Sequence, residues 1–391
     1  MPDLAFVIKR YGAGAVGGAE TLVRQFSRQL SARGYTVEVL TTCMRDERPW
    51  QNAYPPGLCQ VDGIPVRRFP IRAPGSARSY ETLGQVIGNR LRHTPEQERQ
   101  WWQAGLHSPA LYSYLRQHGQ EYRLAVIVDY SVGLSLYALA ANPGRTAVYP
   151  LLHREPFAFL PSVRRWLNAA HGIIFNLEAE REFAQCDLGV TNPNIAIVGA
   201  GVEAGLIGQG ARFRRKFGIH QPFLLYVGRL EAAKNVQALM SCFGQYKSGR
   251  DTPLNLVVLG TGSYPVPDHP DIVPLGYASE QDKFDAYAAA LAVCQPSLLE
   301  SLSIVVLEAL GQGTPCLVHG ANDVTRYHCL AGNCGLYFYA CADFALGLDF
   351  LQAHPAACQQ LGQNGRRYVL QNYTWPLATE RLLEALKQFG W

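Results

Sequence analysis

The sequence predicts an α/β protein with two doubly wound domains, each a parallel β-sheet covered by helices on both faces. Short runs rich in Val, Ile and Leu alternate with longer segments of helical periodicity along the whole chain, which is typical of parallel strands joined by helices. The 391 residues also exceed what one hydrophobic core usually organises. We therefore expect two domains of similar size.

The first domain is expected to span residues 1–203. The segment 20–33 has the apolar periodicity of an amphipathic helix, and Asp62-Gly63 between two apolar runs predicts a tight hairpin turn. Residues 44–118 form a longer connection than a crossover requires, so we expect them to decorate a binding site. Apolar runs predict strands near 4–9, 35–41, 124–129, 146–152, 172–176 and 194–198.

A second α/β series is expected over residues 204–375, after a glycine-rich interdomain linker at about 203–212. A last helix over 376–391 follows, in which Thr374 can cap the start and Pro376 fits the first turn. The predicted strands of this domain lie near 223–227, 254–259, 271–275, 291–295, 315–318 and 335–338.

Composition limits the classes of function. The net charge of +4 is too small to indicate a nucleic-acid partner, and no apolar segment approaches the length of a membrane span. The amino terminus has the pattern of a buried strand, not of a secretory signal, so we expect a soluble cytoplasmic protein. The ten cysteines contain no C-x-x-C pair, which predicts reduced, mostly buried thiols, with Cys329 and Cys334 the only pair of interest.

A basic segment from Arg67 to Arg99 precedes Trp101 and Trp102. Such a segment can contact an anionic membrane surface peripherally or bind a pyrophosphate-linked acceptor. The alternative is a set of solvated arginines next to tryptophans of the core. We favour the alternative because these are the commoner roles of both residue types.

The most informative segment follows the predicted strand that ends at Gln295. A polar turn leads into an apolar helix that begins near Ser303, so the free amides of the helix start face the carboxyl edge of the sheet, where anions bind. Glu300 lies in the turn, and Glu308 lies more than one turn inside the helix with its side chain leaning back. Two carboxylates beside a diphosphate are tolerable only if they accept hydrogen bonds from hydroxyls. A sugar nucleotide supplies both the diphosphate and the hydroxyls.

A second segment places two cations after a strand. Gly228 forms a turn that carries Arg229, and Lys234 follows five positions later. At the same sheet edge, both cations can neutralise a diphosphate as it leaves with added negative charge. A solvated turn is the alternative, and the agreement with the helix start favours the ligand-binding interpretation.

Taken together, these motifs resemble the retaining glycosyltransferases of family 4, which have the GT-B architecture of two Rossmann-like domains with an interdomain cleft. Any one motif is weak, whereas their order and spacing are specific and cover nearly the whole chain. The residues that carry the resemblance are Gly17-Gly18-Ala19-Glu20, Asp62-Gly63-Ile64, His153, Gly199-Ala200-Gly201-Val202-Glu203, Arg229 with Lys234, Gly260-Thr261-Gly262, Glu300 with Glu308, Gly313-Thr314-Pro315 and Tyr373-Thr374-Trp375.

The resemblance implies roles for the charged residues. Arg229 and Lys234, next to Gly228, would hold the donor diphosphate. Glu308 would hold the ribose hydroxyls, and Glu300 would contact the donor sugar.

It also implies contacts from the backbone. Gly17 and Gly18 would form a loop against the phosphate. Family members commonly have glycine where this chain has Ser303, and this difference affects how closely the backbone there can approach the donor. Amides that would contact sugar and phosphate are those of Leu302, Ser303 and Ile304.

The remaining implied contacts concern the base and the acceptor. The base would lie near Gly276 and Tyr277, and His153 would face the sugar and acceptor. A lone histidine after a strand is also commonly a core residue bonded to backbone, so both interpretations of His153 stay open. The resemblance further implies that the last helix, 376–391, packs back on the first domain.

The implied reaction is transfer of a sugar, with glucose favoured, from a UDP-sugar to a glycan or lipid-linked acceptor. Envelope or extracellular polysaccharide synthesis is the expected role. In such enzymes the leaving phosphate assists the acceptor hydroxyl on the same face, so the anomeric configuration is retained. No D-x-D motif occurs, which argues against a metal on the diphosphate, and no cofactor is expected besides the nucleotide sugar and its UDP product.

Three alternatives remain. Residues 12–17 match the G-x-G-x-x-G pattern of NAD enzymes and Glu38 follows, but the glycines come too late after the strand and Glu38 lies inside the next one. Another GT-B enzyme, such as a sugar-nucleotide epimerase or an inverting transferase, shares the fold and the diphosphate chemistry. A catalytically silent sugar-nucleotide or polysaccharide-binding protein is the third. Incubation with candidate donors distinguishes these by the products formed.

Overall fold

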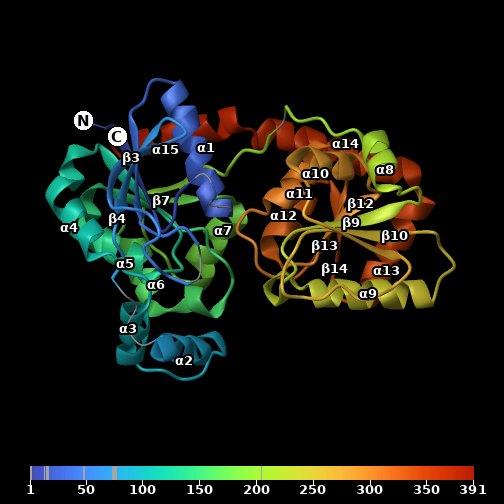
Figure 1. Cartoon of the computed structure of the whole chain (residues 1–391), viewed down its shortest axis with the longest axis horizontal. Helices are drawn as coiled ribbons and strands as arrows, with labels where there is room; N and C mark the ends of the chain where they lie inside the picture. Colours follow the sequence, from blue (N-terminus) through green and yellow to red (C-terminus); the bar gives the residue numbers. More distant parts are fainter. Residues whose placement is uncertain (1, 13, 15–16, 47–48, 73–76, 204) are drawn as a thin grey trace. The chain divides into compact units, whose positions relative to one another are not determined.

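The computed structural model describes residues 2–12, 14, 17–46, 49–72, 77–203 and 205–391. The chain divides into two compact units. The first unit comprises residues 1–199 together with 378–391, and the second comprises residues 200–377 (Figure 1). Each unit has its own sheet and its own hydrophobic core.

The sheet of the first unit has the strand order β3-β4-β2-β1-β5-β6-β7-β8. Apart from the antiparallel β3–β4 hairpin, neighbouring strands run parallel. The strands are β1 (Leu4–Ile8), β2 (Val37–Thr42), β3 (Gly57–Val61), β4 (Ile64–Phe69), β5 (Leu124–Val128), β6 (Thr146–Tyr149), β7 (Gly172–Phe175) and β8 (Ile195–Ile197).

Helices cover both faces of this sheet. The helices α1 and α15 lie on one face, and α3 to α6 pack their buried aromatic and aliphatic residues on the other (Figure 1). Both faces of the central strands are therefore apolar, as a parallel sheet requires. The helices are α1 (Gly18–Ala32), α2 (Ala77–Gly88), α3 (Pro95–Ala104), α4 (Pro109–His118), α5 (Gly133–Ala141), α6 (Pro161–Ala169), α7 (Glu178–Glu182) and α15 (Trp375–Gln388).

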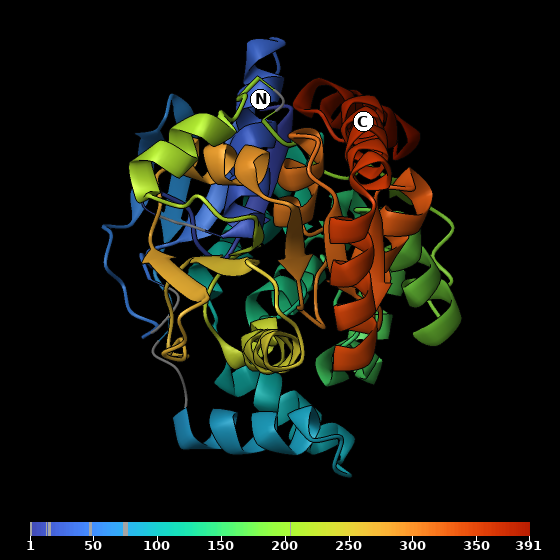
Figure 2. The same cartoon turned by 90° about the vertical axis from the view of Figure 1, so that its right-hand side faces the viewer.

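The second unit has a parallel sheet in the order β11-β10-β9-β12-β13-β14. In Figure 2 this sheet lies between α9 on one side and α8 and α10 on the other. Its strands are β9 (Phe223–Val227), β10 (Asn255–Leu259), β11 (Ile272–Gly276), β12 (Ala292–Gln295), β13 (Cys316–His319) and β14 (Gly335–Phe338). Its helices are α8 (Gly210–Phe217), α9 (Val236–Ser248), α10 (Glu280–Ala289), α11 (Ile304–Gly311), α12 (Asp323–Gly332), α13 (Cys341–Ala353) and α14 (Pro355–Asn372).

The carboxyl-terminal helix α15 ends against the first unit. The ring nitrogen Nε2 of His171 lies 2.7 Å from the carbonyl oxygen of Phe389, and Trp391 Nε1 donates to the carbonyl of Asp3 at 3.0 Å. The ring of Phe389 also occupies the space where a side chain at Gly172 would project. The last residues of the chain thus complete the packing of the first unit's sheet.

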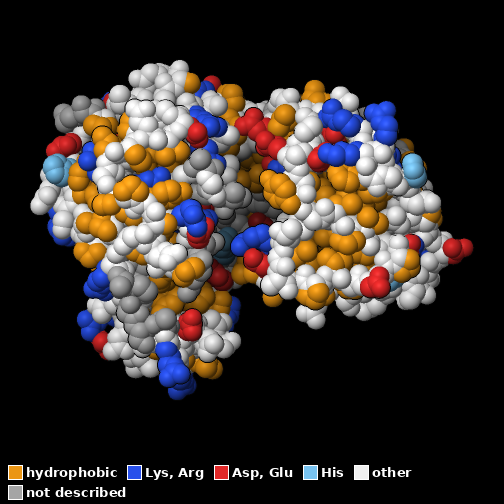
Figure 3. All heavy atoms as spheres, in the orientation of Figure 1, with side chains coloured by type: hydrophobic (Ala, Val, Ile, Leu, Met, Phe, Trp, Pro, Cys, Tyr) orange, Lys and Arg blue, Asp and Glu red, His pale blue; other side chains and the backbone are white. Residues whose placement is uncertain are grey.

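The predicted strands are found in the structure, with their ends shifted by at most three residues. The hairpin is confirmed as well, since Asp62 and Gly63 have φ values of 52° and 79°, the left-handed conformation that a two-residue turn requires. Trp101 and Trp102 are both buried at 3% exposure, which confirms the interpretation that placed them in the core. On the face drawn in Figure 3, Lys and Arg side chains stand singly or in small groups near Asp and Glu.

The prediction of uniformly reduced thiols is wrong. Cys242 of α9 and Cys341 at the start of α13 form a disulfide across 99 residues of sequence. The pair singled out from the sequence, Cys329 and Cys334, consists of two buried free thiols. Sequence spacing cannot reveal a pair that is created by two helices packing side by side on one sheet face.

In the part of the chain that the structure describes, no helix is both long and apolar enough to cross a membrane.

Candidate functional site

The sheet of the second unit has one topological switch point, between its neighbouring strands β9 and β12. From β9 the chain proceeds to β10 and β11 on one side, whereas β12 leads to β13 and β14 on the other. Ligands of open α/β sheets bind in the crevice at the carboxyl ends of the strands at such a point. The two segments singled out from the sequence follow these two strands, so the fold brings them to one place.

Lys234 and Glu300 are in direct contact at this switch point. The Nζ atom of Lys234 lies 2.7 Å from Oε1 of Glu300, and both side chains are largely buried. The neighbouring residue Asn235 is left-handed, with φ 55°, and its Nδ2 donates to the carbonyl of Pro296 at 3.1 Å. This bond connects the turn after β9 to the turn after β12. It therefore holds the lysine and the carboxylate in register.

Arg229 has a different environment. Its side chain is 64% exposed and forms an ion pair with Glu231 at 3.2 Å. Its backbone is well fixed, because the hydroxyl of Tyr226 donates to the Arg229 carbonyl at 2.8 Å. The turn also needs glycine at position 260, since a side chain there would overlap the carbonyl of Gly228. The structure thus places the guanidinium at the surface, where it pairs with Glu231.

The turn that carries Glu300 is fastened from a neighbouring helix. Asn322, which caps α12, donates from Nδ2 to the carbonyl of Ser297 at 3.2 Å. Nε2 of His328 lies 2.8 Å from the carbonyl of Leu302, and its Nδ1 lies 3.0 Å from the hydroxyl of Tyr368. Burial lowers the pKa of His328 to about 4, so the ring is neutral at pH 7 and serves as a structural donor.

Helix α11 begins directly after a strained residue. Ser303 has φ 62° and ψ 69°, a left-handed conformation that is costly for a residue with a Cβ atom. Its Oγ is buried and has no hydrogen-bond partner among the residues that the structure describes. The predicted helix start at Ser303 and Ile304 is confirmed, and the amides of the first turn lie at the sheet edge as expected.

Glu308 lies inside α11 and is held by two residues that the sequence did not single out. Oε1 lies 2.8 Å from Nζ of Lys283, and Oε2 accepts from the hydroxyl of Tyr287 at 2.9 Å. Burial, followed by the charge of Glu308, raises the pKa of Tyr287 far above its usual value, so the phenol stays a donor. Lys283 and Tyr287 are four residues apart on α10, which puts them on one helix face. The four-residue spacing of Lys283 and Tyr287 was the only signal in the local sequence that could have identified them as partners of Glu308.

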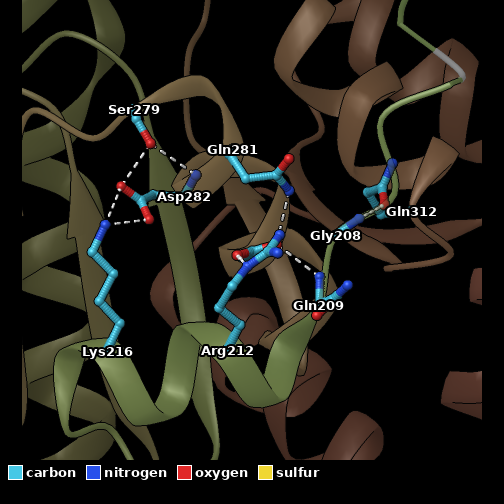
Figure 4. Close-up of polar contacts among 9 residues, drawn as sticks. Gly208, Gln209, Arg212, Lys216, Ser279, Gln281, Asp282 and Gln312 are labelled. Atoms are coloured by element: carbon cyan, nitrogen blue, oxygen red, sulfur yellow. Dashed lines mark hydrogen bonds and ion pairs between the residues drawn. The ribbon is translucent and has the colours of Figure 1, made fainter.

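The segment that leads into the second unit fastens α10 in place (Figure 4). Arg212 of α8 points toward α10 and forms a two-pronged ion pair with Asp285, whose Oδ1 also accepts from the backbone of Gln209 at 2.7 Å. Lys216, one turn further along α8, pairs with Asp282 at 2.7 Å. These contacts lie on α10 beside Lys283, so they help to position the helix that holds Glu308.

Gly276 is the last residue of β11, and Tyr277 follows it at the same sheet edge. Gly276 is left-handed, with φ 68°, and its carbonyl accepts from the backbone of Gly260 at 2.8 Å. The ring of Tyr277 is 88% exposed, so it is available to a planar ligand. This arrangement places an aromatic side chain next to the crevice.

The glycines expected at the phosphate lie in the first unit. Gly17 is the residue before α1 and Gly18 is its first residue, and the carboxylate of Glu20 fills the space beside Gly17. Residues 13, 15 and 16 of the glycine-rich segment lie outside the described residues. The NAD interpretation is not favoured, because β1 ends at residue 8, well before these glycines, and Glu38 lies inside β2, where it pairs with Arg67 at 2.8 Å.

His153 follows β6 in the first unit, with Nδ1 3.8 Å from Oε1 of Glu155. Glu155 also accepts a 2.5 Å hydrogen bond from the buried Tyr130, and Arg154 pairs with Asp187. Glu180 of α7 is fully buried, and this burial raises the pKa of its carboxyl to about 7. The histidine therefore stands among polar groups and not in an apolar core.

Comparison with known proteins agrees with these features. Residues 211–368 match the family described as glycosyl transferases group 1, and residues 17–201 match the glycosyl transferase 4-like domain. The D-inositol 3-phosphate glycosyltransferase of Kribbella flavida is 25% identical over 423 residues, covering 96% of this chain and 92% of that protein. The O-antigen chain mannosyltransferase B of Escherichia coli is 28% identical over 188 residues, covering 44% of this chain and 43% of that protein.

Solved structures share the fold over the full length. Sucrose-phosphate synthase from Thermosynechococcus elongatus has a TM-score of 0.73 and 15% identity, covering 100% of this chain and 99% of that one. HepE of Anabaena, solved in complex with UDP-glucose, has a TM-score of 0.70 and 15% identity over 98% and 99%. WaaG, a glycosyltransferase involved in lipopolysaccharide biosynthesis, has a TM-score of 0.66 and 15% identity over 96% and 98%.

The predicted fold class is therefore confirmed. The two family models match consecutive parts of the chain, and the structural neighbours cover its full length. Both findings agree with a site at the switch point of the second unit. The chain belongs to the group 1 glycosyltransferases and is an enzyme with the GT-B architecture.

Proposed function

We propose that the protein is a retaining, metal-independent glycosyltransferase that moves a glucose-type sugar from a UDP-sugar to a glycan or lipid-linked acceptor. Its role would be envelope or extracellular polysaccharide synthesis, in the cytoplasm or peripherally at the inner face of the membrane. The complexes of HepE with UDP and UDP-glucose support a UDP-sugar donor, and the role of WaaG in lipopolysaccharide biosynthesis supports the envelope.

The observation that carries this proposal is the Lys234–Glu300 contact at the β9–β12 switch point, in front of the start of α11. An ammonium group has three donors, so Lys234 can bond a phosphate oxygen while it keeps Glu300. The free amides of α11 add partial positive charge at the same edge. Arg229 is exposed and long enough to add a second cation. Together they stabilise the diphosphate as it leaves.

The two glutamates would recognise hydroxyl groups of the donor. In Glu308, Lys283 and Tyr287 hold one oxygen each, which leaves further lone pairs for the ribose hydroxyls. In Glu300, Lys234 engages Oε1, and Oε2 can accept from the donor sugar. Because both carboxylates have fixed partners, binding does not have to order them.

The leaving phosphate would accept the proton of the acceptor hydroxyl on the face from which it departs. The new glycosidic bond then forms on that same face, and the configuration at the anomeric carbon is retained. Electrostatic stabilisation of the departing diphosphate would supply most of the rate enhancement, without a metal.

Calorimetric titration with UDP tests the donor site. Lys234→Met should raise the Kd for UDP at least tenfold, because a hydrogen bond to a charged group contributes about 1.5–3 kcal/mol. Arg250→Met is the control, since that cation pairs with the half-exposed Asp349 of α13 in the same unit, and its Kd should change less than twofold. Equal effects of both substitutions would contradict the assignment.

Incubation with UDP-glucose or GDP-mannose tests the reaction. Retention predicts release of the donor's own nucleoside diphosphate and a product with the anomeric configuration of the donor, seen by NMR, at a rate that EDTA leaves unchanged. Interconverted donor would instead indicate an epimerase, and binding without release would indicate a silent binding protein.

A further inference from the structure

The first unit has a cavity among the helices that cover one face of its sheet. The cavity has a volume of about 470 Å³ and opens between α3, α5 and α6 (Figure 1). The described residues that line it all belong to these three helices. Small-molecule sites have volumes of roughly 300–1,000 Å³, so this cavity is large enough for one. It lies in the helix layer and not at the ends of the strands.

One wall of the cavity is apolar and fixed. Trp102 of α3 is 3% exposed, and its Nε1 donates to the hydroxyl of Ser162 at 2.8 Å. Tyr137 of α5 meets the buried His107 ring edge-on, with ring centroids 4.8 Å apart. Leu136 also lines the cavity and packs against the same hydrophobic core. Because these side chains already have packing partners, an apolar ligand group would meet a preformed surface.

The cavity also contains a buried carboxylate that no cation neutralises. Glu98 of α3 is 4% exposed, and its Oε1 accepts from the backbone nitrogen of Ser162 at 2.9 Å, at the start of α6. Arg99, the next residue, pairs with Glu96. Among the described residues, Oε2 of Glu98 has neither a cation nor a hydrogen-bond donor. A buried charge without a partner is costly, so a cationic ligand group would be stabilised there.

A cation without a carboxylate partner lies one helical turn away. Arg165 follows Ser162 by three residues on α6, so the two lie on the same helix face. Its side chain is exposed and, in the part of the chain that the structure describes, forms no ion pair. Because Glu96 and Arg99 neutralise each other, the lining leaves one negative and one positive group to be matched. A ligand with a single charge can match only one of them.

We propose that this cavity binds a free α-amino acid with a large apolar side chain. The ammonium group donates to Oε2 of Glu98, and the carboxylate pairs with Arg165. The side chain packs against Trp102, Leu136 and Tyr137. An α-amino acid carries its two charges on neighbouring groups, which suits a carboxylate and a guanidinium that are about one helical turn apart. The inference goes beyond the proposed glycosyl transfer and does not depend on it.

Saturation-transfer NMR titrations of the full-length protein test the inference with L-phenylalanine and L-leucine as probes. Phenethylamine lacks the carboxylate, 3-phenylpropionate lacks the ammonium group, and glycine lacks the apolar side chain. Side-chain protons of both amino acids should receive saturation from the protein, and each of the three incomplete probes should have a Kd about tenfold higher or more. No saturation of either amino acid, or an incomplete probe that binds as tightly, would overturn the inference.

Substitutions then assign the two charged groups. Glu98→Gln keeps an oxygen for the backbone of Ser162 and removes the charge, so the Kd for L-phenylalanine should rise about tenfold or more. Arg165→Met, at an exposed position, should weaken L-phenylalanine similarly and leave the Kd for phenethylamine unchanged. Glu121→Gln is the matched control, because it removes the same charge from an exposed glutamate that pairs with His118 in the same unit, and it should leave every Kd unchanged. If Glu98→Gln does not fold, Arg165→Met decides alone, and an unchanged Kd for L-phenylalanine in either cavity variant would refute the inference.

Discussion

Ser303→Gly should make the second unit more stable, although it removes atoms from a buried position. Ser303 is left-handed, with φ 62°, at the residue before α11, and its buried Oγ lacks a partner among the described residues. Both features oppose folding. Glycine adopts this backbone conformation without steric cost and carries no hydroxyl.

The magnitude follows from these two terms. A buried hydroxyl without a partner costs about 1 kcal/mol or more, and left-handed backbone costs a residue with a Cβ atom about 1 kcal/mol. Glycine loses more chain entropy on folding, which offsets about 0.7 kcal/mol. The net gain is therefore about 1.3 kcal/mol, and the Tm of a unit of this size should rise by roughly 3–5 °C.

Scanning calorimetry of the full-length protein measures this shift. Ser303→Ala is the matched control, because it removes the hydroxyl, keeps the Cβ atom and should gain about 1 kcal/mol at most. Val23→Ala, in the core of α1, assigns the transition of the first unit by lowering it alone. An unchanged or lower Tm in Ser303→Gly would refute the reasoning and show that the serine stabilises the turn.

Three further predictions concern the second unit. Lys283→Met should raise the Kd for UDP about tenfold in calorimetric titration, because Glu308 loses its charged partner; an unchanged Kd would show that the pair does not position the carboxylate. His328 has a folded pKa of about 4, below its unfolded value of 6.5, so stability is lost as pH falls from 6.5 toward 4, by at most about 3 kcal/mol. His328→Gln should flatten this dependence in urea unfolding at pH 7 and pH 4.5, and an equally steep loss would exclude the histidine as its source. Gly260→Ala should lower the free energy of unfolding by about 3 kcal/mol or more, because the new Cβ atom would lie 1.8 Å from a backbone oxygen. Gly244→Ala, inside α9 with open space around it, should instead raise the free energy of unfolding by about 0.5–1 kcal/mol, and thermal melting measures both. Similar Tm values for the two alanine variants would contradict that comparison.

Much of the fold follows from local sequence. The strands of both sheets were predicted to within a few residues because an apolar run between turn residues is a local signal. Asp62-Gly63 specified its turn for the same reason, since only residues that tolerate positive φ fit there. The start of α11 after β12 was also predictable from the change of pattern at Ser303. Lys234 and Glu300 could be expected at one edge because both follow strands of one parallel sheet.

What the sequence by itself determined is therefore which segments form strands, turns and helices, and which residues stand at strand ends. Only the tertiary structure decided which side chains contact each other. Lys283 contacts Glu308 across 25 residues of sequence, and Cys242 bonds to Cys341 across 99. Lys9 contacts Asp129 because β1 and β5, which are far apart in sequence, are neighbours in the sheet. Such pairs arise from the packing of helices and the order of strands in a sheet, and no periodicity within one segment records the partner that another segment presents.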